Sequence, residues 1–327
     1  MFLYKVDFPF SEKVLNFKEL NTKNQLDIEK INLYYPQTSE FSIDYHENFL
    51  KIVRECVENK EDFDNLNLIE YVLFCLKLRI VSIGNNIDFN VKNDRDDVKN
   101  INIKVNLSEI MQNILTLSLN SLKEYFVDDE VRDMLITIGF PTLNSVKYFS
   151  DWMSSGKDIG EIVMESLPLF IKQVKIKNDI LNLDGFSFEQ KTKLYDTFPV
   201  SIKNKIEQLI IGCISKIGEN NVFGIEYFKD EKINFYNLFF VNFLRVIFSQ
   251  NPKGIYEEIY ILSNFHVDSN YVMSISPSER KVFISFIKAQ QKSKESNTDT
   301  ITNDMENMKN SSAVDDLAVE FGDIPPN

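Results

Sequence analysis

The first part of the chain mixes strand-like and helix-like patterns of apolar residues. Residues 3–8 alternate between polar and apolar side chains, which predicts a β-strand. A short helix is then predicted to run to about Tyr34, because Pro36 cannot continue it. In residues 41–57 the apolar side chains return at helical spacing, so a second helix is expected to pack one face against a core.

Residues 66–81 carry the strongest helical pattern of the chain. Apolar side chains occupy two faces of the predicted helix, which is typical of a buried helix. Arg79 stands alone among them near the C-terminal end, where its charge suits the helix dipole. If Arg79 is buried, it needs a carboxylate or carbonyl partner. Two interpretations stay open: an internal ion pair that holds this helix to the next element, or a contact with another protein.

A β-hairpin is predicted directly after this helix, which ends at Gly84. Residues 87–91 and 101–107 alternate, and the polar segment 92–100 joins them. Farther along, residues 108–125 show a helical or mixed period. A strand-like run at 134–140 is closed by Pro141.

The second half of the chain is predicted to be mainly helical. A break and a helix start fall within residues 150–160, which places a module boundary there. Ser187 and Ser276 each open a capping-box sequence, and Pro277 takes the first helical position after Ser276. One strand is expected at 222–227, before a turn at 229–232. The expected helices cover 161–177 with a kink at Pro168, 187–196, 199–217, 235–248, 256–265 and 277–292.

The composition changes at Lys294, where Ser, Thr, Asn, Asp and Lys become dominant. Such a segment buries too little apolar area to offset its ordering entropy, so residues 294–327 are predicted to be a disordered acidic tail. Residues 314–321 place apolar side chains among acids; they can dock on a partner or simply solvate the tail. The expected fold is α+β, with a mixed module containing the hairpin at 1–150 and a helical module at 151–293.

Net charge and cysteine content limit the classes of function. The chain of 327 residues has a formal net charge of −13, and such a surface repels nucleic acid. Cys56, Cys75 and Cys213 lie among apolar residues at helical spacing, and we expect buried free thiols in a reducing compartment. We find no membrane-spanning stretch and no signal-peptide pattern, so a cytosolic protein is expected.

Motifs of enzymatic chemistry are missing from the sequence. The two histidines, His46 and His266, lie far apart; His46 is expected on a helix surface and His266 beside a helix end. No metal-ligand spacing, nucleophile motif or glycine-rich phosphate loop occurs. Paired acids such as Asp96–Asp97 are interpreted as solvated loop charge. We therefore predict a non-enzymatic protein without catalytic, cofactor or metal site; an enzyme with an unmarked carboxylate site is the alternative.

Several short segments, taken in their order, resemble one family. The resemblance is to the baseplate hub and hub-assembly (tail assembly chaperone) proteins of T-even-like contractile-tailed phages. It covers residues 1–290 loosely, and the order of the segments carries more weight than any one of them. The segments are Lys18–Glu19, the helix 66–84 with Leu68, Glu70, Tyr71, Leu73, Phe74, Leu76, Leu78, Arg79, Ser82 and Gly84, then Phe140–Pro–Thr142, residues 186–199 and residues 275–284.

The resemblance implies a non-enzymatic role in contractile tail morphogenesis. A hub component or hub-assembly chaperone would bind other tail proteins, such as hub subunits or the tape-measure protein, in the host cytoplasm or in the virion baseplate. A host-encoded interaction scaffold remains a further alternative. We expect the helix 66–84 to anchor the fold through Leu68, Glu70, Tyr71, Phe74, Arg79 and Gly84. Partner contacts are predicted at Ser276, Pro277, Glu279, Arg280, Leu317 and Phe321.

Overall fold

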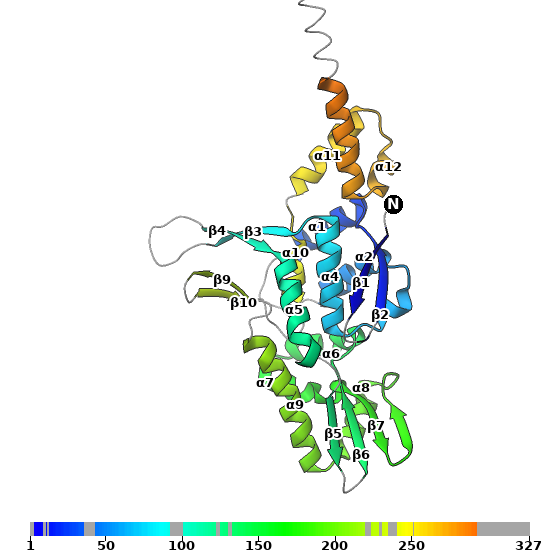
Figure 1. Ribbon diagram of the computed structural model, residues 1–327, viewed down its shortest axis with the longest axis vertical. Helices are drawn as coiled ribbons and strands as arrows, with labels where there is room; N and C mark the ends of the chain where they lie inside the picture. The colour runs from blue at the N-terminus through cyan, green and yellow to red at the C-terminus, as the bar shows by residue number, and fades with distance from the viewer. Residues whose placement is uncertain are drawn as a thin grey trace, which may run out of the picture.

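Three groups of elements follow one another along the long axis of the computed structural model (Figure 1). We call them the sheet lobe, the central body and the C-terminal helical unit. The fold is α+β, as the sequence predicts. The structure describes residues 3–8, 11, 13–35, 43–91, 101–121, 125–129, 133–219, 224–228, 231–234, 241–250 and 252–292. The predicted disordered tail lies outside these ranges.

The central body forms around helix α4 (Leu68–Ser82), which is buried on all sides as its apolar pattern predicts. Two antiparallel hairpins pair β1 with β2 and β3 with β4, and the second is the hairpin expected after Gly84. Helices from both halves of the chain complete this core. The other elements are β1 (Leu3–Phe8), β2 (Lys13–Lys18), α1 (Thr22–Tyr34), α2 (Ile43–Glu55), α3 (Lys60–Asp64), β3 (Asn86–Val91), β4 (Ile101–Asn106), α5 (Leu107–Ser121), η1 (Leu143–Ser145), α6 (Val146–Ser154) and α10 (Val241–Phe248).

The sheet lobe is a four-stranded antiparallel sheet in the order β5-β6-β7-β8, with helices against it (Figure 1). Its core joins inward residues of the strands, such as Ile136 and Val174, which lie opposite each other, to Ile202 and Ile206. The two last residues belong to the long helix of the lobe. The elements are β5 (Tyr125–Asp129), β6 (Met134–Ile138), α7 (Ile159–Ser166), η2 (Leu167–Phe170), β7 (Ile171–Ile176), β8 (Asp179–Asn182), α8 (Phe188–Asp196) and α9 (Val200–Glu219).

The C-terminal helical unit consists of α11 (Pro252–Asn264), α12 (Ser269–Ser274) and a last helix at residues 277–292. It has a small apolar cluster of its own, centred on Leu262 and Val272. The unit lies against α1 at the end of the molecule opposite the sheet lobe (Figure 1). A further hairpin pairs β9 (Gly224–Phe228) with β10 (Glu231–Asn234), where the sequence predicts one strand and a turn.

The predicted kinked helix at 161–177 is wrong. Helix α7 ends at Ser166, a 3₁₀ turn follows, and the chain continues as strand β7 from Ile171. Pro168 explains the break, because it lacks a backbone N–H and clashes with the preceding turn of a helix. The sequence reasoning also missed β2, α3, β5, α6, β8 and α12, all of them short.

The predicted module boundary near residue 150 stays a prediction. The core of the central body includes Ile162, Leu244 and Phe248, while the core of the sheet lobe begins at Val127, so both cores draw on either side of that boundary. Among the described helices, none is at once long and apolar enough to cross a membrane.

Candidate protein-binding surface

The predicted anchor begins at the N-terminus of α4. The Asn67 side chain accepts hydrogen bonds from the amides of Ile69 (3.0 Å) and Glu70 (2.9 Å), and the Glu70 carboxylate accepts from the Asn67 amide (3.2 Å). This capping box satisfies N–H groups that a helix end leaves without partners. The Leu68 amide also donates to the Pro141 carbonyl at 3.1 Å. The Phe–Pro–Thr segment at 140–142 is therefore joined directly to the start of α4.

Aromatic rings surround the middle of α4. Phe74 is fully buried, and its ring meets Phe17 at 5.5 Å and Phe63 at 5.2 Å between centroids, both edge-to-face. Tyr71 packs edge-to-face against Phe63 and His46. The prediction that His46 lies on a helix surface is therefore wrong: His46 is buried, because its side of α2 faces α4. Burial lowers the pKa of His46 to about 4, which keeps the ring neutral.

Arg79 is buried at the C-terminal end of α4 and makes internal contacts. Its Nε donates to the Ile247 carbonyl of α10 at 2.6 Å, and its guanidinium also donates to the Gly84 carbonyl. Of the two interpretations of Arg79, these contacts favour the internal one, with carbonyl oxygens in place of the expected ion pair. Burial lowers the pKa of Arg79 to about 10, so it remains a cation at neutral pH. Gly84 has a positive φ of 133°, a conformation that glycine adopts without strain.

The cap of the last helix is built as the sequence predicts. The Ser276 amide donates to the Glu279 carboxylate (2.9 Å), the Glu279 amide donates to the Ser276 hydroxyl (3.3 Å), and Pro277 follows the cap. The residue before the cap is tied to α1, because the Ile275 carbonyl accepts from the Thr22 amide at 3.0 Å. The N-terminal cap of the last helix therefore lies where this helix is attached to α1.

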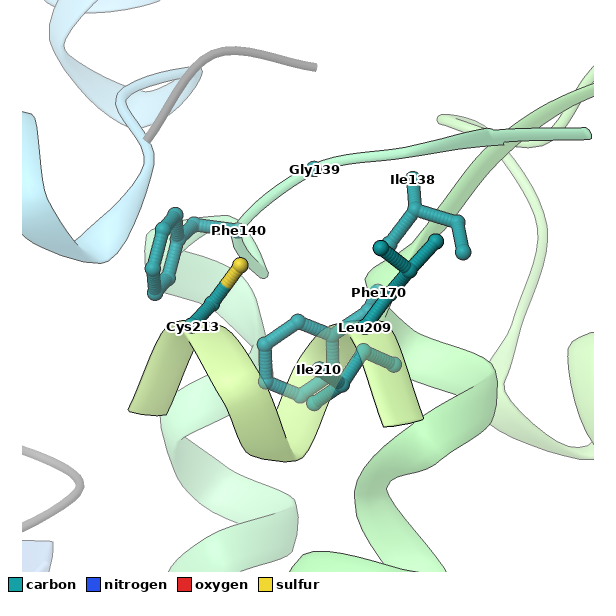
Figure 2. Close-up of a pocket in the computed structure, with 7 residues that line it drawn as sticks. All are labelled: Ile138, Gly139, Phe140, Phe170, Leu209, Ile210 and Cys213. Atoms are coloured by element: carbon teal, nitrogen blue, oxygen red, sulfur yellow. The ribbon is translucent and has the colours of Figure 1, made fainter. Parts of the chain in front are cut away.

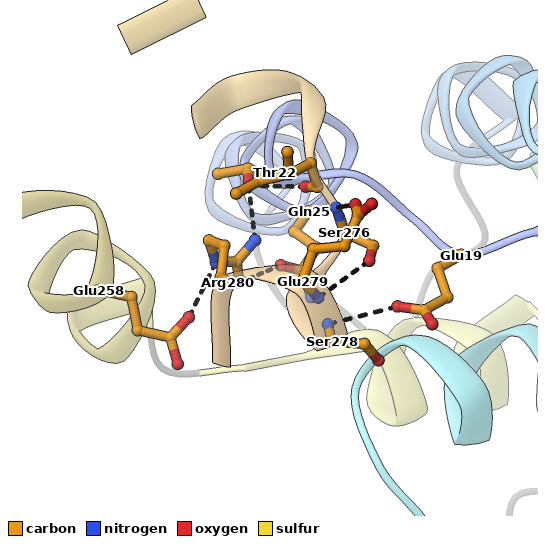
Figure 3. A network of polar contacts seen from close by, with 9 residues as sticks. Glu19, Thr22, Gln25, Glu258, Ser276, Ser278, Glu279 and Arg280 are labelled. Atoms are coloured by element: carbon orange, nitrogen blue, oxygen red, sulfur yellow. Dashed lines mark hydrogen bonds and ion pairs between the residues drawn. The ribbon is translucent and has the colours of Figure 1, made fainter. Parts of the chain in front are cut away.

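Arg280 is the centre of a polar network that fastens this helix to the rest of the chain (Figure 3). Its side chain is only 2% exposed and donates to Glu258 at 2.8 Å, to the Thr22 hydroxyl at 2.6 Å and to the Gln25 side-chain oxygen at 2.8 Å. Glu19 adds a longer contact by accepting from the Ser278 amide at 3.4 Å. The buried charge of Arg280 thus has hydrogen bonds on each nitrogen of its fork.

The predicted partner residues of the last helix therefore lie mainly inside the chain. Ser276 and Arg280 are buried, and they bond to α1, α11 and the cap itself. Leu317 and Phe321 lie outside the described residues. Whether any of the six predicted positions touches another protein stays a prediction, since the structure holds a single chain.

The outward face of the last helix is apolar instead. Val282 is 53% exposed and Phe286 is 62% exposed, one helical turn apart. Phe283, between them in sequence, is half-buried and packs edge-to-face on Tyr271 of α12. Exposed large apolar side chains that adjoin one another mark interaction sites more often than scattered ones do. We call Val282, Phe286 and the adjoining Ala289 the outer stripe.

Sequence reasoning missed the outer stripe for a definite reason. The last helix is apolar around most of its circumference, with Ile284 and Ile287 inside and Val282 and Phe286 outside. Periodicity alone does not say which of two apolar faces meets the body. The position of Arg280 is the signal that could have helped, because a charge on the inward face needs partners supplied by the fold.

Two cavities in the described part of the chain offer weaker candidates. A polar cavity of about 490 Å³ at the start of α4 is lined by Glu70, Lys13, Lys172 and Asp184 among others, with charges of both signs. An apolar pocket lies between α9 and the start of the β6–η1 connection, where Cys213 faces Phe140 (Figure 2). No cluster of three His, Cys, Asp or Glu side chains able to hold a metal occurs in the described ranges.

The cysteine prediction holds for two of the three residues. Cys56 and Cys75 are buried free thiols, and burial raises the pKa of the Cys56 thiol to about 12. Cys213 is half-buried.

Comparison with known proteins gives a family match over much of the chain. Residues 1–218 match the family described as T4 bacteriophage base plate protein. No curated protein matches, and no solved structure does. The matched range contains α4 and the sheet lobe up to, but not including, the last residue of α9, while the outer stripe lies beyond it.

Proposed function

The chain belongs to the T4 bacteriophage base plate protein family, and on that premise we propose that it is a baseplate hub component or a hub-assembly chaperone. In either role it acts by binding another tail protein during contractile tail morphogenesis, without enzymatic chemistry. Its place would be the host cytoplasm during assembly and, for a hub component, the baseplate of the virion. Family membership argues against a host-encoded scaffold.

One observation carries the choice of binding surface. The last helix is held by a buried polar network on its inner side, which leaves its apolar outer stripe facing solvent. Ile284 and Ile287 already bury the inner side of the helix, so Val282 and Phe286 are not needed for its own packing. A partner protein can then cover these two side chains, and each Å² of apolar area that it covers stabilises the complex by about 25 cal/mol.

The charge beside the outer stripe suggests the chemistry of the partner. Lys281, Lys288 and Lys292 are exposed and lie along one side of the stripe, given about 100° of rotation per residue. The surface therefore suits an amphipathic helix with acidic side chains next to its apolar face, packed side by side with the last helix. Hub subunits and the tape-measure protein are the proposed sources of such a helix.

An enzyme with a carboxylate site is the second candidate. The polar cavity at Glu70 favours it, since this carboxylate is 1% exposed and its Oε1 has no hydrogen-bond partner in the structure. Among the described residues that line this cavity, however, no second buried carboxylate accompanies Glu70, and we prefer the binding role.

Affinity capture from phage-producing cells tests the proposal. Full-length tagged chain, the Val282→Ser/Phe286→Ser variant and Tyr260→Ser would be recovered and their bound proteins identified by mass spectrometry. Tyr260 is a matched control, since it is 68% exposed but lies on α11. We expect a hub or tape-measure protein with the wild type and the control, and a loss of at least about tenfold with the double variant. Equal recovery by all three would contradict the proposed surface.

The same preparation separates the two proposed roles. A hub component is expected in purified virions at a fixed ratio to other baseplate proteins. A chaperone is expected in the capture experiment and absent from the virions.

A further inference from the structure

Residues 314–321 have a pattern that the binding surface does not yet explain. Four of their five apolar side chains recur at positions i, i+3, i+4 and i+7, the spacing that puts them on one face of a helix, while Val319 falls on the other side among the acids. The acidic side chains fall on the flanks and the opposite face. The apolar set is Val314, Leu317, Ala318 and Phe321, and the acidic set is Asp315, Asp316 and Glu320.

The outer stripe has the complementary pattern. Its apolar side chains, Val282, Phe286 and Ala289, are bordered by the exposed lysine row Lys281, Lys288 and Lys292. The only acidic side chain of this helix, Glu279, is engaged in the N-terminal cap. An acidic amphipathic helix can therefore place its apolar side chains on the outer stripe and its acidic side chains beside the lysine row.

We propose that residues 314–321 bind the outer stripe of the same chain, as a short helix laid along residues 277–292. The connection is long enough, because residues 293–313 span roughly 25 Å as a flexible linker. The last helix, residues 277–292, is about 24 Å long, so the connecting segment can return along its whole length. Tethering also supplies an effective concentration in the millimolar range, so even a weak contact is occupied.

The consequence is a competition at one surface. A tail protein with an acidic amphipathic helix would have to displace residues 314–321 before it could bind, which delays binding until a partner of sufficient affinity is present. The contact within the chain requires no partner, so this inference goes beyond the proposed function and can be tested without it.

Hydrogen exchange on the purified full-length chain tests the contact. In the wild type, we expect the amides of residues 314–321 to exchange at least about tenfold more slowly than in Val282→Ser/Phe286→Ser, because docking makes helical hydrogen bonds. The Leu317→Asp/Phe321→Asp variant should lose the same protection. Ile301→Asp, in the connecting segment, should keep it. Equal exchange in the wild type and the Val282→Ser/Phe286→Ser variant would overturn the proposal.

A charge exchange tests the orientation of the contact. Lys281→Glu/Lys288→Glu and Asp315→Lys/Asp316→Lys should each speed exchange of residues 314–321, and the combined variant should recover part of the protection. Additive losses in the combined variant would overturn the proposed pairing of acids with the lysine row.

Dependence on concentration distinguishes the same chain from a second copy. Docking within one chain predicts protection that is the same at low and high protein concentration. Protection that grows with concentration, together with a dimer in sedimentation, would overturn the proposal in favour of exchange between copies. No other protein is present in these measurements, so their failure leaves the capture experiment as an independent test.

Discussion

Helix α4 and the last helix are attached to the protein in opposite ways. Helix α4 is surrounded by apolar side chains and carries one buried arginine at its end, which bonds to backbone carbonyls. The last helix buries Ile284 and Ile287 within its own small unit, bonds to α1 through the buried Arg280, and keeps an apolar stripe on its outer face. Apolar enclosure fixes a helix permanently within a core. A helix that packs on one side only keeps an exposed face that another protein can bind.

Phe74→Ala should give the largest effect on stability and shows what enclosure contributes. The ring is fully buried between Phe17 and Phe63, and its removal leaves a cavity at the centre of the core. We expect a loss of about 3–5 kcal/mol in the free energy of unfolding, measured by chemical denaturation of the full chain. A loss below about 1 kcal/mol would mean that α4 is not the anchor of the fold.

Arg280→Met should give a smaller and more local effect. It keeps an apolar stem but leaves Thr22, Gln25 and Glu258 without their hydrogen-bond donor. We expect a loss of about 2–4 kcal/mol, confined to the attachment of the C-terminal helical unit. Hydrogen exchange should speed up in α12 and residues 277–292 and stay unchanged in α4.

Arg280→Lys is the matched control for this change. It retains the positive charge but loses the fork geometry, so its effect should lie between those of the wild type and Arg280→Met. Faster exchange throughout the chain in either variant would contradict the view that the unit is attached separately.

The junction between α1 and the C-terminal helical unit should also make the stability of the chain depend on pH. Glu29 of α1 accepts from the Gln250 amide, just before α11. Burial raises the pKa of Glu29 from 4.5 to about 7, against the opposing effect of the hydrogen bond from the Gln250 amide. The folded chain therefore binds more protons than the unfolded chain between these values, and stability falls as pH rises through 7.

The contribution of Glu29 to the free energy of unfolding should fall by about 0.5–1 kcal/mol between pH 6.5 and 8. Glu29→Gln should remove it, as measured by denaturation at the two pH values. His46 has the opposite trend, since its lowered pKa costs stability as pH falls through 6.5 towards 4. That trend is present in both proteins, so the difference between the wild type and Glu29→Gln reports Glu29 alone. An unchanged slope in Glu29→Gln would show that the junction does not carry the effect.

Val282→Ser/Phe286→Ser should change stability least of all. Both side chains are more than half exposed, so we expect a difference within about 0.5 kcal/mol in denaturation experiments. A loss as large as that of Arg280→Met would mean that the outer stripe helps to hold the helix, and the contrast between the two helices would disappear.

The two helices also differ in what could be predicted from sequence. The apolar pattern of residues 66–81 and the break at Gly84 suffice to place α4 and the hairpin after it, because these are local signals. The capping sequence at Ser276 likewise places the start of the last helix. Pro168 was interpreted wrongly: it ends the helix instead of kinking it, because the residues after it pair with β6 in a sheet.

The network of Arg280 could not be predicted, because its partners come from distant parts of the chain. Thr22 and Gln25 precede Arg280 by more than two hundred positions, and no local pattern connects them. The same holds for His46, whose burial depends on how α2 packs against α4. Periodicity shows that a helix has an apolar face, but tertiary packing decides which face remains outside.

The most direct test of the account is the affinity of the purified chain for the tail protein identified by capture. Titration calorimetry would compare the wild type, Val282→Ser/Phe286→Ser and Tyr260→Ser, with equal thermal stability as the condition for comparison. We predict affinity at least about tenfold weaker for the double variant alone. Equal affinity for all three would contradict the claim that the outer stripe of the last helix binds another tail protein.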